Sequence, residues 1–511
     1  MAPLSFRRPL RPLLVLFLLS LIIYYQTRST VSKREFLRAS QSAASKVFPH
    51  NIVPPPKPKP RNMKWKAPPF QPLEPDFYTT SEHDGSGVVA GQAVYWRRIV
   101  AVGDVHGDLP HLTRILRHLD LLSLKNEWIG GRTILVQTGD IVDRGKDTIA
   151  LYRFFDILRP QAERAGGALV NLLGNHELMN AMHDWRYVTP EVGLSRAPTA
   201  VSLLARAIWL IRPLTLNQDI ASFGGERARL EAMTTGWIGK SWRANYSIIA
   251  RVPLAPYGLP VPPSLSIEYA PPINGIPTSL KYAQDPPLPP LKGKGQQDPF
   301  SHAAIAFVHG GTIPEYLRSL SLKPGQTLVT KINEIGSSIL ESLVNDSISP
   351  LQLPPKSTDE QKIFWSEQGP MWNREYALHE DEDEICERAK RACDMLGVRR
   401  MVMGHTPDFE QVRERCEGRI LLIDTGISRA YGGSLSALEI ITTYTPQSPF
   451  PAPFIPGPLD EPITLDTPRE VPDGPMSWLE KEVVKAIYVG ERGRDQVVLA
   501  EEERYVELPG L

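Results

Sequence analysis

The sequence predicts an α/β fold with a parallel sheet built from repeated strand–helix–strand units. Three aliphatic runs, at residues 98–102, 133–137 and 168–173, each lead into a polar loop bounded by glycine. Asp104, Asp140 and Asn175 in these loops lie 36 and 35 residues apart, which leaves room for a crossover helix and a short loop between strands. We therefore expect the three loops to meet at one edge of the sheet, where open α/β sheets bind ligands.

The remaining elements follow from apolar periodicity. Residues 109–122 and 147–164 have the spacing of crossover helices. The acidic run 380–384 predicts the solvated start of a helix and not a metal site. We expect further helices at 177–211, 226–233 and 385–396, and strands at 246–252, 304–308 and 400–403.

Composition indicates one large globular domain with appendages. The chain has 511 residues, of which 42% are apolar and 22% charged. The 57 basic and 57 acidic residues cancel, so no net field favours nucleic acid, and we expect no nucleic-acid partner. Cys386, Cys393 and Cys416 are too few for a disulfide framework or a zinc cage. Core packing is the favoured interpretation, and one disulfide with one remaining thiol is the alternative.

The N-terminus predicts membrane targeting. A basic segment at 1–12 precedes an apolar segment at 13–25, which is short for a membrane span of about 20 residues. An uncleaved signal anchor is favoured because residues 26–29 make a weak cleavage site. A cleaved signal peptide and a buried helix are the alternatives.

The expected location is a membrane of the secretory pathway, of the endoplasmic reticulum, Golgi or vacuole type, crossed once with the catalytic domain in the lumen. The short apolar segment suits thinner early secretory membranes. Asn245 and Asn345 begin glycan acceptor sequons. Because basic residues flank both sides of the apolar segment, a cytosolic domain is the alternative.

Proline content suggests the domain boundaries. Residues 26–95 are expected to form a linker, with nine prolines between Pro54 and Pro75. Residues 96–445 form the expected catalytic domain, interrupted at 253–300 by a proline-rich insertion. A proline-rich extension, 446–511, follows, in which 478–487 is either a short amphipathic helix or solvated surface structure.

Oxygen and nitrogen donors gather in the expected loops. His309 and His405 each follow a predicted strand within glycine-flanked sequence, and they join the three earlier loops. Without a thiolate, such a set suits two divalent ions such as Mn, Fe or Zn. Asp140 is the natural bridge between them. The donors are Asp104, His106, Asp140, Asn175, His309 and His405.

This set predicts phosphoester chemistry. Two cations clamp a phosphate and lower the pKa of a bridging water, which then attacks in line. Arg144 can neutralise phosphate oxygens. Asp143 can orient His176 as the acid that protonates the leaving oxygen.

The ordered motifs resemble a known family. The series GDVHGD (103–108), GDIVDRG (139–145), GNHE (174–177), HGG (309–311) and GHT (404–406) is similar to the phosphoprotein phosphatase branch of the calcineurin-like metallophosphoesterases. Segments 364–374 and 424–433 resemble the Shewanella-like protein phosphatases in particular.

The resemblance implies a fold and a set of roles. The fold would be a central β-sandwich flanked by helices, in four layers. Asp104, His106 and Asp140 would hold one metal, and Asp140, Asn175, His309 and His405 the other. His176 with Asp143 would be the general acid pair, and Arg144 and Arg374 the phosphate clamp. The long interval from Asn175 to His309 is a departure that leaves the substrate open.

Three functions remain open at this point. The first is a phosphoprotein phosphatase acting on Ser/Thr or Tyr with a metal-bridging hydroxide as nucleophile. The second is a phosphoesterase for dinucleoside polyphosphates, polyphosphate or similar small molecules. The third is an inactive, membrane-tethered binding protein. The sequence does not indicate an oligomeric state.

Overall fold

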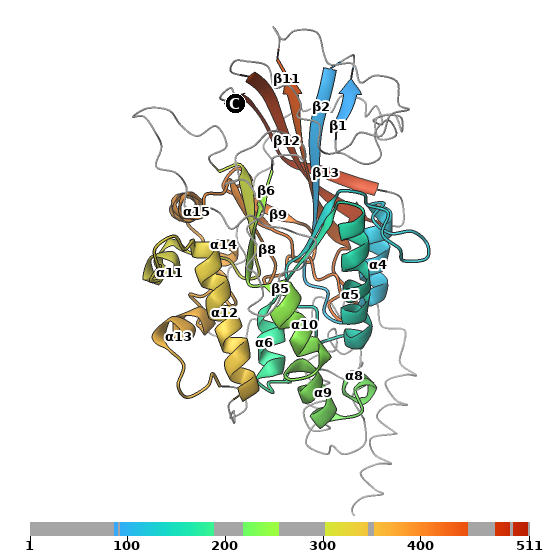
Figure 1. The fold of residues 1–511 in the computed structure, drawn as a ribbon, viewed down its shortest axis with the longest axis vertical. Coiled ribbons are helices and arrows are strands. Elements are labelled where there is room, and N and C mark those ends of the chain that lie inside the picture. Colours follow the sequence, from blue (N-terminus) through green and yellow to red (C-terminus); the bar gives the residue numbers. More distant parts are fainter. Residues whose placement is uncertain are drawn as a thin grey trace, which may run out of the picture. The chain divides into compact units, whose positions relative to one another are not determined.

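The computed structural model describes residues 86–89, 92–188, 218–254, 302–345, 352–447, 476–490 and 494–508. These residues form a mixed α/β fold with two mixed β-sheets (Figure 1). The expected N-terminal anchor, most of the expected linker and nearly all of the proline-rich insertion lie outside the described residues. The end of the expected linker, 26–95, is wrong, because residues 86–89 and 92–95 belong to two paired strands, β1 and β2, of the larger sheet.

The larger sheet has eight strands in the order β13-β12-β11-β2-β3-β4-β5, with β1 paired to β2. Strands β2 to β5 run parallel to one another, and the other pairings are antiparallel. The strands are β1 (Ser86–Val89), β2 (Gln92–Val102), β3 (Ile134–Gln137), β4 (Ala168–Leu172), β5 (Tyr246–Ser247), β11 (Ser436–Pro446), β12 (Met476–Val489) and β13 (Arg494–Leu508).

The smaller sheet has five strands in the order β6-β7-β8-β10-β9. Strands β7, β8 and β10 are parallel, and the edge strands β6 and β9 are antiparallel to their neighbours. The strands are β6 (Ile249–Pro253), β7 (Ala304–Val308), β8 (Arg400–Met403), β9 (Arg413–Arg415) and β10 (Ile420–Leu422).

The two sheets share a hydrophobic core because alternate residues of each strand point to opposite faces. In β2, Ile99 and Ala101 pack in a cluster with Phe307 of β7 and Val402 of β8. The intervening Val100 of β2 belongs instead to the core shared with the helices. Burying side chains on both faces explains why these strands are almost continuously apolar.

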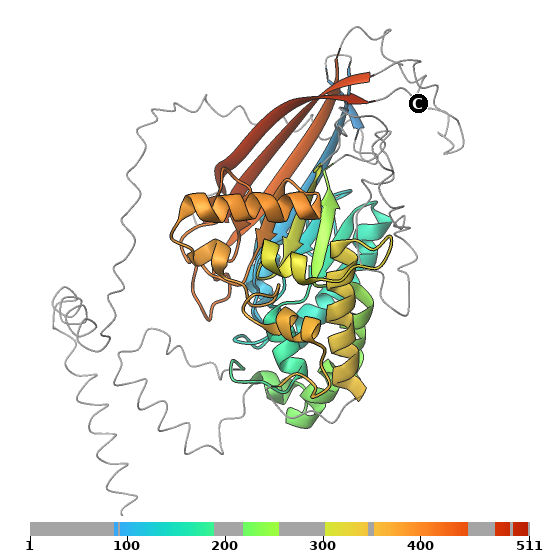
Figure 2. The same cartoon turned by 90° about the vertical axis from the view of Figure 1, so that its left-hand side faces the viewer.

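Helices lie beside both sheets (Figures 1 and 2). Helix α5 contacts β4 of the larger sheet, and α12 contacts β6 of the smaller one. The helices are α4 (Leu109–His118), α5 (Thr148–Arg164), α6 (Asn175–Ala181), α8 (Gln218–Ser222), α9 (Glu226–Met233), α10 (Trp237–Asn245), α11 (Pro314–Ser319), α12 (Leu328–Asn345), α13 (Asp359–Trp365), α14 (Glu375–Leu378) and α15 (Glu382–Leu396).

Several predicted elements agree with the structure. The crossover helices are α4 and α5, and the adjacent parallel strands β2, β3 and β4 bring their loops to one edge as expected. Helix α15 begins in the acidic run, with the Asp381 side chain accepting from the backbone N–H of Glu384. Strands β6 and β7, which flank the insertion, are neighbours in one sheet.

Two predicted elements are wrong in extent. The helical region expected at 177–211 is helical only to Ala181 and continues in turns to Val188, whereas its part from 189 to 211 lies outside the described residues and stays a prediction. The expected strand at 246–252 divides at Ile248, so that β5 joins the larger sheet and β6 the smaller. Apolar periodicity does not reveal a change of sheet, because each half is buried.

The expected helix or solvated segment at 478–487 is also wrong, because these residues lie in β12 of the larger sheet. Residues at alternate positions of β12 are buried, including Glu480 and Glu482. Arg399 forms ion pairs with both carboxylates, and Arg400 Nε lies 2.8 Å from Glu482 Oε1. The two buried glutamates obscured the strand periodicity, because the partners that compensate their burial lie elsewhere in the chain.

One cysteine expectation is corrected. Cys386 of α15 and Cys416 after β9 form a disulfide, whereas Cys393 is a buried thiol. The alternative, one disulfide with one remaining thiol, is therefore confirmed, and both Cys393 and Cys416 are buried in the core. In the described part of the chain, no helix combines the length and apolar character needed to cross a membrane.

Candidate metal centre

Five loops meet where strands of the two sheets end. The loops after β2, β3 and β4 carry Asp104, Asp140 and Asn175, and those after β7 and β8 carry His309 and His405. Potential metal-binding atoms lie within 4.8 Å of one another in two groups that share Asp140. The first contains His106 and His176, and the second His309 and His405.

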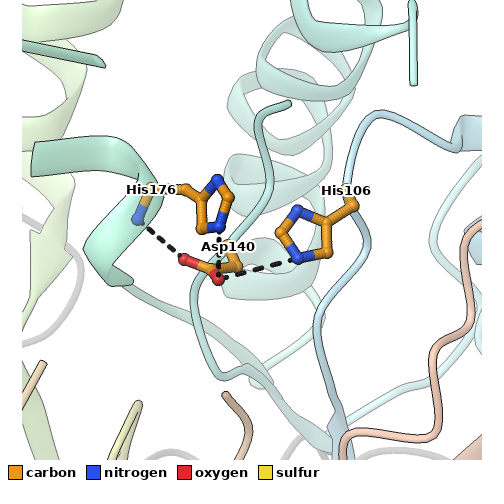
Figure 3. A group of neighbouring side chains, drawn as sticks. All are labelled: His106, Asp140 and His176. Carbon is orange, nitrogen blue, oxygen red and sulfur yellow. Dashed lines mark hydrogen bonds and ion pairs between the residues drawn. The ribbon is translucent and has the colours of Figure 1, made fainter. Parts of the chain in front are cut away.

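Asp140 lies between the two groups. Its Oδ2 is 3.6 Å from His106 Nε2 and 3.8 Å from His176 Nε2 (Figure 3). Its Oδ1 is 3.3 Å from His309 Nε2. One carboxylate therefore presents a different oxygen to each group, which is the arrangement that a bridging ligand needs.

Backbone carbonyls determine which nitrogen of two histidines faces the centre. His106 Nδ1 lies 2.9 Å from the carbonyl oxygen of Val142, and His309 Nδ1 lies 2.9 Å from that of Thr138. Since a carbonyl can only accept, each Nδ1 carries the proton, and in the neutral ring Nε2 offers a lone pair toward Asp140. Metal-binding histidines usually donate their second nitrogen in this way.

Two buried atoms in the cluster need a cation. Among the described residues, neither Asp104 Oδ1 nor His405 Nε2 has a hydrogen-bond partner, although both are buried. Burial raises the pKa of Asp104 well above its usual value, and the negative charges of Asp424 and Asp140 raise it further. A divalent ion would offset this repulsion between carboxylates. The donor set therefore fits metal ions.

Three of the six donors have strained backbone conformations. His106, Asp140 and His405 have positive φ angles of 43°, 54° and 69°, and such strain is concentrated at functional sites. Two glycines allow the carboxylates to approach closely. A Cβ at Gly174 would lie 2.1 Å from Asp140 Oδ1, and one at Gly404 would lie 2.1 Å from Asp104 Oδ1.

His176 and Asp143 form a buried pair beside the cluster. His176 Nδ1 lies 2.6 Å from Asp143 Oδ2. Burial opposes charge on His176, yet Asp140 and Asp143 outweigh it and raise its pKa. His176 Nε2 still faces Asp140, so distance alone also permits it as a metal ligand. Its pairing with Asp143 is the geometry of an oriented acid.

Both predicted clamp arginines lie near this centre. The Arg144 guanidinium carbon is 4.7 Å from the ring centroids of both Tyr187 and Tyr431. Rings on two sides of the guanidinium restrict its direction through cation–π contacts. Arg374 donates from Nη1 to the carbonyl oxygen of His405, at 3.0 Å, and to Thr406 Oγ1, at 3.1 Å.

Sequence reasoning missed several residues of the site. Glu177, in the GNHE motif, was assigned no role, but it accepts from the backbone N–H groups of Asp140, Ile141 and Gly174 and so ties two donor loops together. The last residue of a recognised motif was an available signal. Asp424 and Tyr431 lie in segment 424–433, whose resemblance to a known family was an available signal, although neither residue was assigned a role. No local signal marked Tyr187, Asn180 or Arg229, which reach the site only through the fold.

A third potential metal-binding group does not fit a metal. It consists of Glu382, Cys386 and Cys416. The disulfide occupies both sulfur atoms, and Glu382 is paired with Arg415. No thiolate remains to bind an ion.

Comparison with known proteins agrees with this geometry. The family model described as calcineurin-like phosphoesterase matches residues 97–254. An uncharacterized protein of Schizosaccharomyces pombe is 32% identical over 356 residues, 69% of this chain and 80% of that protein. Shewanella-like protein phosphatase 2 of Arabidopsis thaliana is 27% identical over 347 residues, 67% of this chain and 75% of its own length.

Among solved structures, a cold-active protein-tyrosine phosphatase of a psychrophilic Shewanella species is similar with a TM-score of 0.40 and 19% identity. The match covers 68% of this chain and 77% of that protein.

The family match and the relative named as a phosphatase identify a phosphoric ester hydrolase, and the donor cluster is consistent with that class. The chain belongs to the calcineurin-like metallophosphoesterases, with Shewanella-like protein phosphatases among its relatives. Its substrate is a phosphorylated molecule.

Proposed function

We propose that the chain is a phosphomonoester hydrolase that uses two divalent metal ions and acts on phosphoproteins. The central observation is that Asp140 presents one oxygen toward His106 and the other toward His309. A carboxylate shared between two donor groups suits a pair of cations. Asp104, His106 and Asp140 would hold one ion, and Asp140, Asn175, His309 and His405 the other. Mn, Fe and Zn all suit these donors.

The protein side chains would orient the phosphate and supply the leaving-group proton. When bound, the metal ions would neutralise the phosphate and activate the attacking water. Arg144 and Arg374 would bind the phosphate oxygens that face away from the ions. His176 would donate the proton at Nε2 to the leaving oxygen, and Asp143 would hold Nδ1 through their 2.6 Å contact.

The name of a relative supports a protein substrate. The Arabidopsis protein, which is 27% identical, is called a protein phosphatase. The proposal covers phosphorylated serine, threonine and tyrosine. A small-molecule phosphoesterase would use the same donors, so the experiment must compare substrates directly.

We also propose that the domain faces the lumen of the secretory pathway, anchored by the apolar segment at 13–25. The Cys386–Cys416 disulfide supports this location, because disulfides persist in oxidising compartments. Protease treatment of intact microsomes, with and without a glycan-removing enzyme, tests the topology. A protected domain that shifts in mobility supports the proposal, and an accessible domain without a shift contradicts it.

The test of function is a substrate comparison with the full chain. The purified protein is loaded with Mn, Fe or Zn and assayed on phosphoserine, phosphothreonine and phosphotyrosine peptides, and on a dinucleoside polyphosphate. Faster turnover of phosphopeptides supports the proposal. Faster turnover of the dinucleotide supports the small-molecule alternative. No turnover, together with the absence of bound metal, would support an inactive binding protein.

A further inference from the structure

A buried arginine lies behind the acid pair and outside the donor set. Arg229 of α9 has no exposed surface. Its guanidinium carbon lies 5.6 Å from the ring centroid of Trp185 and 5.3 Å from that of Phe223. A guanidinium removed from water needs compensating anions, and a buried ion pair is weak evidence for stability. The question is therefore what this cation does for its partners.

The partners of Arg229 lead directly to the acid pair. Its Nη2 lies 3.3 Å from Asp143 Oδ1 and donates to Asn180 Oδ1 at 2.8 Å, while Nη1 pairs with Asp219. Asn180 Nδ2 in turn donates to Asp143 Oδ1 at 2.9 Å and to the carbonyl oxygen of His176 at 2.9 Å. Arg229 thus reaches Asp143 both directly and through Asn180.

We propose that Arg229 is a positioning residue that holds the Asp143 carboxylate in the orientation in which it directs His176. The proposal rests on the proposed role of His176 as the general acid. Asp143 Oδ1 is held by Arg229 and Asn180, which leaves Oδ2 for His176 Nδ1. With both oxygens engaged, the carboxylate cannot rotate, so the imidazole keeps Nε2 directed at Asp140.

Electrostatics agree with this geometry. Burial alone would raise the pKa of Asp143, but the hydrogen bond and charge of His176, together with the charge of Arg229, lower it. An ionised Asp143 can only accept, so Nδ1 of His176 must be the donor. Arg229 therefore keeps Nδ1 of His176 directed at an ionised Asp143, which stabilises the doubly protonated imidazolium whose Nε2–H an acid would donate.

A purely structural role is the alternative, because Arg229 also connects α9 to Asp219 of α8. The two roles differ in one measurable property. A positioning residue affects the reaction in proportion to leaving-group basicity, because a basic leaving oxygen depends most on protonation. Loss of structure would instead reduce turnover of all substrates by the same factor.

The experiment uses the full chain and a series of aryl phosphates from nitrophenyl to phenyl phosphate. Arg229→Met is compared with His176→Asn, with the double variant and with Arg400→Met. Arg400 is the matched control because it is also buried and paired with carboxylates, Glu482 and Glu502, but belongs to β8. Metal content and thermal unfolding are measured for every variant.

We expect Arg229→Met to retain both metals. Its kcat should fall about tenfold on phenyl phosphate but only about twofold on nitrophenyl phosphate. This loss is smaller than the rate enhancement of about 10²–10⁴-fold that a general acid contributes, because Arg229 acts through His176. The loss should largely vanish when His176 is already Asn, because the two residues act as one unit. Arg229→Lys should lose less activity on phenyl phosphate than Arg229→Met, because lysine restores the positive charge but not the planar fork of the guanidinium.

Equal losses on all aryl phosphates in Arg229→Met would overturn the proposal, as would a full loss in the His176→Asn background. If His176→Asn loses the same factor on all aryl phosphates, His176 is not the general acid. That result contradicts the proposed function of His176, and not the contact between Arg229 and Asp143. If Arg229→Met does not fold, Asp219→Asn is used, which loosens the guanidinium without removing it. A steeper leaving-group response in that variant supports the proposal, and a uniform loss overturns it.

Discussion

Nδ1 of His176 lies 2.6 Å from Oδ2 of Asp143, and neither side chain is exposed to solvent by more than a few per cent. This contact separates the proposed acid from the metal donors, because it uses the nitrogen that does not face Asp140. Replacing His176 by Asn should therefore leave the metals in place. Turnover of serine phosphate should fall by about 10²–10⁴-fold, while nitrophenyl phosphate should lose less than about tenfold. Steady-state kinetics and elemental analysis test both points, and lost metal would identify His176 as a ligand.

Asp140→Asn should lose more metal than any variant of a terminal donor. Among the described residues, only this carboxylate belongs to both groups, so its neutralisation should weaken the binding of both ions. His405→Ala is the comparison, because His405 belongs to one group only. Elemental analysis after dialysis provides the measurement. Two tightly held metals in Asp140→Asn would contradict the bridging role.

Deleting residues 255–298 should leave the fold intact and alter substrate preference. The flanking strands are already paired, with Pro253 opposite Ala304, so a short turn can replace the insertion. The free energy of closing a short turn differs from that of closing the long insertion by about a few kcal/mol at most. Circular dichroism and the peptide panel are the measurements. An insoluble product, with the full chain soluble under the same conditions, would show that the insertion supports the core.

Acid should weaken the attachment of the C-terminal strands. Burial opposes ionisation of Glu482, but Arg400 and Arg399 outweigh it and lower its pKa. Because the pKa of Glu482 is lower in the folded state, its ion pair stabilises the fold fully above the pKa of the unfolded chain, near 4.5. This stabilisation is lost as the pH falls through the pKa of the folded state. Between pH 7 and pH 3 the unfolding temperature of the parent should therefore fall further than that of Glu482→Gln. Parallel curves would show that this ion pair does not contribute.

The disulfide should stabilise the domain. Its cysteines are 30 residues apart, and the chain-entropy model gives about 3–4 kcal/mol for a loop of this size. Cys386→Ser should lower the free energy of unfolding by roughly that amount, measured by urea denaturation in oxidising buffer. Cys393→Ser is the control that leaves the disulfide intact. Equal unfolding midpoints for Cys386→Ser and the oxidised parent would mean that the bond adds no stability.

Much of the candidate site follows from local sequence. The donors stand directly after apolar strands, and neighbouring parallel strands must end at the same edge of a sheet. For this reason the gathering of Asp104, Asp140 and Asn175 could be predicted from spacing alone. The glycines beside them also have a local meaning, since Gly174 and Gly404 stand where a Cβ would collide with a carboxylate.

Other features were beyond local patterns. The division of residues 246–252 between two sheets depends on where each half finds a partner, and both halves are equally apolar. Likewise, the expectation of a helix or solvated surface structure at 478–487 was wrong because Glu480 and Glu482 look like solvated positions in the sequence. They are buried in a strand beside partners from elsewhere in the chain, among them Arg399 and Arg400, about 80 positions earlier.

By itself, the sequence determined the parallel strands β2, β3 and β4 with their crossover helices, the donors that follow these strands, and the chemistry that such donors favour. The tertiary structure decided which cysteines pair, that β12 completes the larger sheet, and that Arg229 lies behind Asp143. The physical reason is the range of the interactions. Periodicity and turn residues act within a few positions, whereas a buried charge is stable only beside a counter-charge that folding brings from elsewhere in the chain.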